Sequence, residues 1–245
     1  SASISLTTVP GSIFSSLRAQ MRMWPAAEWV SGIALIRHNL TVHSRWRLTG
    51  WLSGAVVWSQ DWAPAAPAQG LGQLAWGVEP VGVNAATSQA APMATAWLAE
   101  PVLVDRLVIE LDDIGNTVGY LQAARLVVGM HWSPDVGTVY GVKMRRATAG
   151  KRTDTDSGQV LSSRGARYRE LVFQMPALTA AERTQMWTHI ESIADDRPVL
   201  VALFPSAANP ALDALHAVYG WWPAQQGAAY DAFDRFSTDV TIREA

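Results

Sequence analysis

Few residues of this sequence have the types and the spacing that catalysis needs. The five histidines show no metal-site spacing, and no cysteine is present to complete such a site. The sequence also lacks the Gly-x-Ser-x-Gly turn of a serine hydrolase and the glycine loops that bind nucleotide phosphates. We therefore expect no enzymatic activity, no cofactor and no bound metal. The histidines are His38, His43, His131, His189 and His216.

Three sets of polar residues leave an alternative open. His38 and Asn39 could be a ligand pair or could satisfy backbone groups at a turn, and we expect the turn role. The segment from Asp112 and Asp113 to Asn116 could hold calcium through oxygen ligands, but we favour a turn that these side chains stabilise. A glycosidase-like pair would need folding to bring two acids together; the candidates are Glu79, Glu100, Asp105, Glu110 and Asp112.

Tryptophan is abundant in this chain, with 12 copies in 245 residues. Aromatic side chains dominate both protein cores and protein interfaces, so this supply favours a subunit of an obligate assembly. The alternative is a platform on which sugar rings stack. The candidate contact residues for a glycan or a protein partner are Trp51, Trp58, Trp62 and Trp76.

The composition argues against two classes of partner. The net charge is −2, and charged residues make up 16% of the chain against 49% hydrophobic residues. Nucleic-acid binding needs a surplus of Lys and Arg, and a membrane-spanning helix needs about 20 apolar residues in a row, so we expect neither. Residues 1–14 lack the basic start and apolar core of a signal peptide. The one basic run, Lys143-Met144-Arg145-Arg146, is predicted to be a solvated or subunit-contact loop.

Apolar residues at every second position predict antiparallel strands within residues 29–129. One pair of strands flanks a polar turn at Arg37-His38-Asn39, and a third strand ends at a turn over Asp112–Gly119, beyond which Tyr120–Val128 forms another. These are the features of inner strands in an antiparallel β-sandwich. The alternating residues are Ile33 with Leu35, Trp46 with Leu48, and Leu107 with Ile109 and Leu111.

The segments around these strands are less regular. Ile4 and Leu6 belong to an uncharged alternating stretch that a neighbouring subunit could pair with by β-addition. The near-helical apolar spacing of Ile13–Met23 predicts a helix. Ala63–Ala96, rich in Ala, Pro and Gly, is predicted to be an extended insertion over the sandwich surface. Residues 145–165 are small, polar and charged, which predicts a polar loop or hairpin.

The C-terminal residues predict an α+β unit. Tyr168–Met175 alternates as a strand with Leu171, Phe173 and Met175 on one face. Thr179 and Glu182 match a capping box, which would begin a helix over about residues 180–194. Three further strands are predicted at residues 199–204, at residues 218–222 and around Val240 and Ile242.

The order and spacing of these segments resemble a family of tailed-bacteriophage tail proteins that carry a galactose-binding-like, discoidin-type β-sandwich. The matching stretches are VSGIALIRHNLTVHSRWRL, VVWSQDW, VDRLVIELDDIGNTVGYLQAARLVVG and RELVFQMPALTAAERTQMW, followed by PVLVALFP and YG. Together they span roughly residues 28–245. The resemblance implies a structural role near the distal end of a phage tail.

The fold implied by this resemblance is mainly β with one clear helix. A galactose-binding-like β-sandwich would be inserted in, or joined to, an α+β ring domain of the tail-tube type. The implied domains are an N-terminal arm at 1–27 that could belong to the ring domain, a sandwich at 28–144, a polar loop or hairpin at 145–165, and a ring-forming domain at 166–245.

The implied function is that of a distal tail protein, a homo-oligomeric ring that links the tail tube to the tail tip or baseplate. Sixfold symmetry is favoured over threefold, the neighbours would be the tail tube protein and the hub or tip proteins, and the location would be the virion. The alternative is a carbohydrate-binding module of the tail tip that contacts host surface glycan. The candidate subunit contacts are Ile4, Leu6, Lys143, Arg145 and Arg146.

Overall fold

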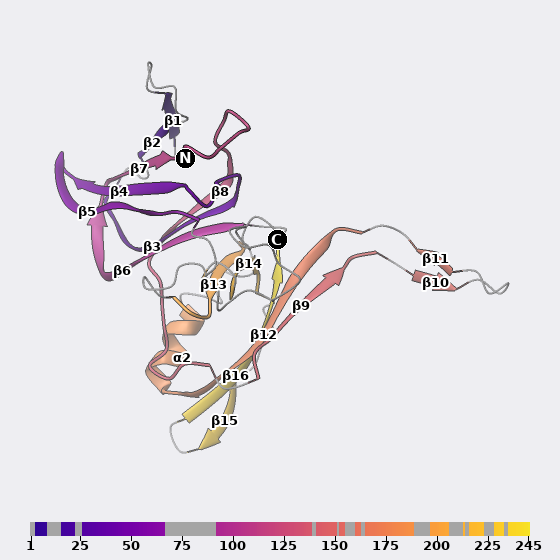
Figure 1. Ribbon diagram of the computed structural model, residues 1–245. Helices are drawn as coiled ribbons and strands as arrows, with labels where there is room; N and C mark the ends of the chain where they lie inside the picture. Colours follow the sequence, from indigo (N-terminus) through magenta and orange to yellow (C-terminus); the bar gives the residue numbers. More distant parts are fainter. Residues whose placement is uncertain are drawn as a thin grey trace. The chain divides into compact units, whose positions relative to one another are not determined.

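The protein is mainly β, and every strand pairing in the part that the structure describes is antiparallel. The structure is a computed structural model that describes residues 3–8, 16–22, 26–66, 92–138, 141–150, 152–154, 160–162, 165–188, 197–205, 213, 216–222, 228–232 and 235–245. The chain forms two compact units (Figure 1). Unit 1 is Ser1–His131 with Phe204–His216, and unit 2 is Trp132–Leu203 with Ala217–Ala245.

Unit 1 contains two antiparallel sheets. The larger sheet has the strand order β1 (Ser3–Thr8), β2 (Ser16–Arg22), β7 (Arg106–Asp112), β4 (Arg45–Leu52) and β5 (Ala55–Pro64). The smaller sheet has the order β6 (Met93–Val104), β3 (Glu28–His38) and β8 (Ala123–Gly129).

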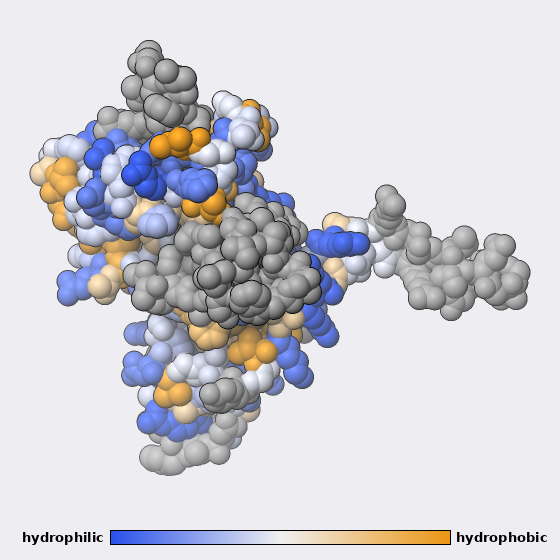
Figure 2. Space-filling model, in the orientation of Figure 1, coloured by the Kyte–Doolittle hydropathy of each residue, from blue (hydrophilic) through white to orange (hydrophobic). Residues whose placement is uncertain are grey.

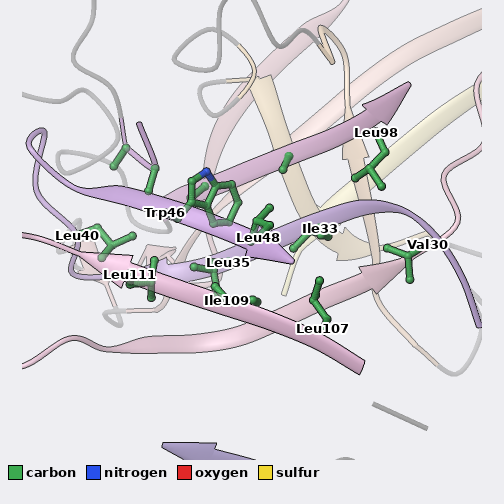
Figure 3. Close-up of a cluster of buried hydrophobic side chains, with 14 of the residues drawn as sticks. Val30, Ile33, Leu35, Leu40, Trp46, Leu48, Leu98, Leu107, Ile109 and Leu111 are labelled. Atoms are coloured by element: carbon green, nitrogen blue, oxygen red, sulfur yellow. The ribbon is translucent and has the colours of Figure 1, made fainter. Parts of the chain in front are cut away.

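One hydrophobic core is shared by the two sheets of unit 1 (Figure 3). Strand β4 contributes Trp46 and Leu48, which are 2% and 0% exposed, and β3 contributes Ile33 and Leu35 from the other sheet. The predicted alternation along β7 is confirmed, because its three leucine and isoleucine residues lie in the same core. A period of two therefore leaves the intervening residues of β4 and β7 on the opposite face of the larger sheet.

The central strand of the smaller sheet, β3, is buried on both faces along most of its length. On the face away from the core, Ala34 of β3 is 0% exposed, and its register partner on β6 is Thr95. Asp213, from the returning segment 204–216, accepts hydrogen bonds from Thr95 Oγ1 and from Trp97 Nε1, the latter at 2.6 Å. Burial raises the pKa of the Asp213 carboxyl, and the hydrogen bonds from Thr95 and Trp97 oppose that effect. Asp213 is thus bonded to strand β6 of unit 1, although the strands β13 and β14 that precede and follow it in the chain belong to unit 2.

The described residues of unit 2 form a six-stranded antiparallel sheet, a separate two-stranded sheet and one helix, α2 (Ala180–Met186). The strands run in the order β13 (Val199–Ala202), β14 (Ala217–Trp221), β16 (Arg235–Glu244), β12 (Arg167–Leu178) and β9 (Lys143–Thr148), and β15 (Ala228–Ala232) also pairs with β16. Leu171, Phe173 and Met175 of β12 lie in the core with Met186 of α2, as the alternation predicted.

The predicted capping box is confirmed at the start of α2. Thr179 Oγ1 accepts a hydrogen bond from the Glu182 backbone N–H at 3.2 Å, and Glu182 Oε2 accepts one from the Thr179 N–H at 2.8 Å. Glu182 Oε1 also accepts from the backbone N–H of Asp135 at 2.7 Å. The same carboxylate therefore fixes both the helix start and the chain that leads into β9. Residues 189–194 of the predicted helix lie outside the described residues.

The last strand, β16, lies inside the sheet of unit 2. Arg169 of β12 and Glu244 of β16 form an ion pair at 2.9 Å whose side chains are only 6% and 4% exposed. Gly220 of β14 is opposite Glu244, and a Cβ atom at residue 220 would lie 2.1 Å from the Arg243 carbonyl oxygen. Only glycine permits this close approach, so β14 and β16 can pair at their ends.

Strands β9 and β12 continue beyond the sheet as a two-stranded ribbon that leads to β10 (Arg152–Asp154) and β11 (Val160–Ser162) (Figure 1). Of the two forms predicted for residues 145–165, the structure has the hairpin. The basic run at residues 143–146 lies in strand β9, and the prediction of a loop there was wrong. Six consecutive register pairs with β12 hold it as a strand.

Two further predictions differ from the structure at the N-terminal side. Residues 16–22 form strand β2 where the helical spacing of Ile13–Met23 predicted a helix, because a seven-residue pairing with β7 overrides that weak periodicity. Since β7 belongs to unit 1, strands β1 and β2 do as well, and the N-terminal arm does not join the C-terminal unit. The division between the units falls after His131, and not after residue 144.

Candidate functional site

The candidate site is the face of the larger sheet in unit 1 that lies opposite the core. We call it the Trp-Arg face and define it by Arg45, Arg47, Trp51, Trp62, Arg106, Glu110 and Asp112. The alternation of β4 and β7 that places leucine, isoleucine and Trp46 in the core also places the other members of this face outward. Trp62 lies on the neighbouring strand, β5.

The register between β4 and β7 sets opposite charges side by side. Arg45 is directly opposite Asp112, and Arg47 is directly opposite Glu110. Arg45 Nη2 lies 2.6 Å from Asp112 Oδ2, and Arg47 Nε lies 2.5 Å from Glu110 Oε2. The hydrogen bond with Glu110 raises the pKa of the Arg47 guanidinium. Cross-strand pairs of this kind orient both members.

Each carboxylate of these pairs is more buried than its arginine. The side chains of Asp112 and Glu110 are 17% and 12% exposed, whereas those of Arg45 and Arg47 are 51% and 41% exposed. The guanidinium groups therefore reach solvent, and the carboxylates beneath them fix their orientation. A partner would meet fixed, planar hydrogen-bond donors.

Two indole rings lie among these arginines. The guanidinium carbons of Arg47 and Arg45 are 5.2 and 5.7 Å from the centre of the Trp62 ring, and Trp62 is 39% exposed. Arg106 lies 4.4 Å from the centre of the Trp51 ring, which is half-buried. Each cation-π contact contributes about 0.5–1 kcal/mol at an exposed site, so the rings and the guanidinium groups hold one another in place.

Apolar residues continue this surface onto β5, the edge strand of the sheet. Val56 and Val57 are 50% and 44% exposed. In Figure 2, apolar residues reach the surface at the end of the sheet where β4 turns into β5. Tryptophan and arginine are the residue types that most often dominate binding energy at protein interfaces. This face therefore has the chemistry of a binding surface.

The four tryptophans predicted to contact a glycan or a partner lie in different places. Trp51 and Trp62 lie on the Trp-Arg face, whereas Trp58 is opposite Gly50 and packs against the core of unit 1. Trp76 lies outside the described residues. The structure thus places two of the four on one face of the sheet, where they contact different arginines, and Trp58 packs against the core.

The predicted subunit contacts lie in two strands. Ile4 and Leu6 belong to β1 and are the register partners of Met21 and Ala19 on β2. Lys143, Arg145 and Arg146 are exposed on β9 of unit 2. Arg145 donates from Nε and Nη2 to the Glu170 carboxylate at 2.8 and 3.0 Å, and this pair lowers the pKa of Glu170.

Sequence reasoning missed the arginines of the Trp-Arg face, and it named Glu110 and Asp112 only as candidates for a glycosidase-like or calcium site. The signal was present, because Arg45 and Arg47 alternate on one strand and Glu110 and Asp112 alternate on another. These residues can be recognised as one surface only when the register between β4 and β7 is known, because that register pairs residues more than 60 positions apart in the sequence.

The polar turns near β3 take structural roles. Asp113 is 0% exposed, and its carboxylate accepts from the Thr41 N–H at 2.7 Å and from the Thr41 hydroxyl. Asn116 Oδ1 accepts from the Val118 N–H at 2.9 Å, an Asx turn. Asn39 bonds to the backbone of Gln122 and Tyr120. Asn116 makes the local turn interaction that we expected there and Asn39 satisfies backbone groups, whereas Asp113 bonds to Thr41, 72 residues away.

The described residues contain no group of three or more His, Asp or Glu side chains that could hold a metal ion. Within the same part of the chain, no helix is long and apolar enough to cross a membrane. No family model, curated protein or solved structure matches the chain.

Proposed function

We propose that this chain is a structural component of a bacteriophage tail, the distal tail protein whose ring links the tail tube to the tail tip or baseplate. The proposal starts from the resemblance described above. The observation that carries it is the construction of unit 2: an antiparallel sheet, a single capped helix that contributes to its core, and a two-stranded extension. This is the form expected of a ring-forming domain of the tail-tube type.

Unit 1 supports the same proposal. Two antiparallel sheets around one core are what a galactose-binding-like sandwich requires. In such an assembly this unit would be carried by the ring domain. The chain passes between the two units more than once, because Phe204–His216 belongs to unit 1 and the strands on either side belong to unit 2.

The described surface is rich in large apolar side chains, as expected of a subunit in an obligate assembly. Together with a charged fraction of only 16%, these residues favour burial between copies and neighbouring tail proteins. In unit 2, those with more than 40% exposure are Val136, Trp187, Trp221 and Tyr230.

The proposed partners are further copies of the chain in a ring, with six copies favoured over three, together with the tail tube protein and the hub or tip proteins. The proposed location is the distal end of the tail in the virion. The role needs no reaction at the chain itself, since symmetric repetition of one contact closes a ring.

Genetic deletion tests this role. In the phage that encodes the chain, loss of its coding sequence should leave tails without a joined tip, and supply of the protein in trans should restore complete tails in electron micrographs. Intact, infectious tails in the deletion phage would refute the proposal.

The Trp-Arg face favours a second candidate function, carbohydrate binding at the tail tip. Trp62 offers an exposed indole beside guanidinium groups that Asp112 and Glu110 hold in place, and stacking with hydrogen bonding is the chemistry that recognises sugars. Binding to a glycan array should be lost in Trp62→Ala and kept in Trp29→Ala, whose indole is 51% exposed on β3. Equal loss in both variants, or no binding by the wild type, would reject this candidate.

A further inference from the structure

The six-stranded sheet of unit 2 has a face opposite its core that carries charged and aromatic side chains. Leu171 of β12 and Ile242 of β16 are register partners inside the core, and both are 0% exposed. Glu170 and Arg243 form the next register pair on the same two strands. Because side chains alternate between the two faces of a strand, Glu170 and Arg243 lie outside the core of unit 2.

The strand register extends this pair into a row across four strands. Arg243 of β16 is also opposite Trp221 of β14, and Glu170 of β12 is also opposite Arg145 of β9. Neighbouring strands lie about 4.8 Å apart, so the row spans about 14 Å. Two further side chains lie on the same face, two positions along β9 and β12. We call the whole set the cationic face; its members are Lys143, Arg145, Tyr168, Glu170, Trp221 and Arg243.

Two contacts hold the arginines of the cationic face in place. Arg145 donates from Nε and Nη2 to the two carboxylate oxygens of Glu170, at 2.8 and 3.0 Å. The guanidinium carbon of Arg243 lies 4.2 Å from the centre of the Tyr168 ring. The hydrogen bonds from Arg145 lower the pKa of the Glu170 carboxyl, the charge of Arg243 adds to this effect, and burial opposes it. Both guanidinium groups are therefore oriented before a ligand binds.

The cations of this face reach solvent more freely than its carboxylate. The side chain of Arg145 is 67% exposed, whereas that of Glu170 is 18% exposed. Lys143 and Arg243 are exposed as well. The next carboxylate on the described strands of this face, Asp239, lies four residues from Arg243 along β16, about 13 Å away at about 3.3 Å per residue. One recessed carboxylate therefore lies among three exposed cations.

An exposed indole ends the row. Trp221 is 44% exposed and lies opposite Arg243. This arrangement gives the sheet little stability, because exposed ion pairs contribute little and an exposed ring leaves apolar area in water. An excess of cations beside an exposed ring instead fits a ligand that is anionic and also has apolar surfaces.

We propose that the cationic face binds an acidic polysaccharide, whose anionic groups contact the arginines while a sugar ring packs on Trp221. A guanidinium group offers planar pairs of N–H donors that match carboxylate and phosphate oxygens. The apolar side of a sugar ring can pack on an indole, as other apolar groups do. A row of side chains that crosses four strands suits an extended chain of rings.

Two other anionic polymers fit the cationic face less well. An extended peptide adds to the edge of a sheet through backbone hydrogen bonds, whereas this row crosses the strands. A nucleic acid binds through many phosphate contacts, whereas the whole chain has a net charge of −2. The inference goes beyond the ring role and the Trp-Arg face, since it adds a ligand to unit 2. In it the polysaccharide, and not a second copy, covers Trp221.

Affinity electrophoresis of the whole chain tests the binding. One set of native gels contains polygalacturonate, hyaluronate or dextran sulfate. The matched set contains methyl-esterified polygalacturonate or dextran, which lack the charges. The chain should migrate more slowly in at least one acidic gel and should be unaffected by the neutral polymers. No retardation by any of the acidic polymers, or equal retardation by their neutral counterparts, would overturn the inference.

Substitution of the arginines locates the site. Arg145→Gln with Arg243→Gln should weaken binding to the acidic polymer by at least about tenfold, because both oriented donors are lost. The matched control is Arg125→Gln with Arg197→Gln, which removes the same charge at exposed residues outside the face and should bind as the wild type does. Circular dichroism and thermal melting establish that each variant is folded. Equal loss in the control would mean that only net charge matters, and would reject the site.

Substitution of the indole tests the contact with a sugar ring. Trp221→Ala should weaken binding several-fold without any change in charge, because the ring's packing surface is lost. The control is Trp29→Ala, whose indole is 51% exposed on β3 of unit 1 and whose loss should have no effect. Unchanged binding in the Trp221 variant would contradict the proposed pose.

Mass photometry of the same variants separates this inference from the proposed ring. A monomer that binds the acidic polymer through Arg145 and Arg243 would support the inference and refute the ring. Rings that form while no acidic polymer binds would leave the ring role standing and overturn the inference. Loss of rings in the arginine variant, without polymer binding by the wild type, would assign these arginines to a subunit contact. Displacement of the polymer by double-stranded DNA at equal charge would overturn the inference in favour of a nucleic acid.

Discussion

At the residue scale, Phe173 links the strand pattern of unit 2 to its core. It is 6% exposed and packs with Leu171, Met175 and Val240. Phe173→Ala should lower the free energy of unfolding by about 3–5 kcal/mol, because it leaves a cavity that its neighbours fill only in part. Urea denaturation measures the loss, and Phe173→Leu should lose less. Wild-type stability in the alanine variant would contradict the placement of this side chain.

His38 makes stability depend on pH. It is 5% exposed, and its Nδ1 accepts from the Leu40 N–H at 3.2 Å. Burial lowers its pKa to about 4, while the backbone of Met93 and the Asp113 carboxylate oppose that shift. An unfolded chain has a histidine pKa near 6.5. As the pH falls from about 6.5 towards 4, the unfolded state binds a proton that the folded state does not, so stability is lost.

The expected size of this effect is about 2 kcal/mol between pH 8 and pH 5. Denaturant unfolding at the two pH values measures it. In His38→Gln this part of the pH dependence should disappear, whatever the variant's stability at pH 8. An unchanged dependence in the glutamine variant would show that other groups carry it.

At the scale of elements, the capping box sets the start of α2. Thr179→Ala should cost about 1 kcal/mol, because the amide of Glu182 loses its acceptor. Thr179→Ser keeps the hydroxyl and should restore most of the stability. Hydrogen exchange of the first-turn amides is the measurement, and equal exchange in the serine and alanine variants would refute the role of the hydroxyl.

The elements also show what local sequence can reveal. Alternation predicted which residues of β4, β7 and β12 enter a core, because burial on one face imposes a period of two. The Thr179–Glu182 spacing predicted the helix start, because a capping box is complete within four residues. The length of the helix beyond residue 188 stays a prediction.

The sequence pattern could not predict which strands pair when they are far apart in the chain. The spacing of Ile13–Met23 favoured a helix, and only pairing with β7 makes residues 16–22 a strand. The same limit applied to the candidate site. Trp51 and Trp62 were visible as tryptophans, but Arg45, Arg47, Glu110 and Asp112 become one surface only through the β4–β7 register. Trp58 was predicted to contact a glycan or a partner. It lies opposite Gly50 instead and packs against the core of unit 1.

At the scale of the whole molecule, the proposed ring role requires that copies of the chain assemble with one another. A chain with few charges and large exposed apolar side chains is suited to repeated contacts with its own copies.

The oligomeric state of the purified wild-type chain tests the central claim most directly. Mass photometry at low salt, followed by negative-stain imaging, should show a closed ring of six copies, each of 26.6 kDa. A monomer that persists at every concentration tested, with no rings on the grid, would contradict the account.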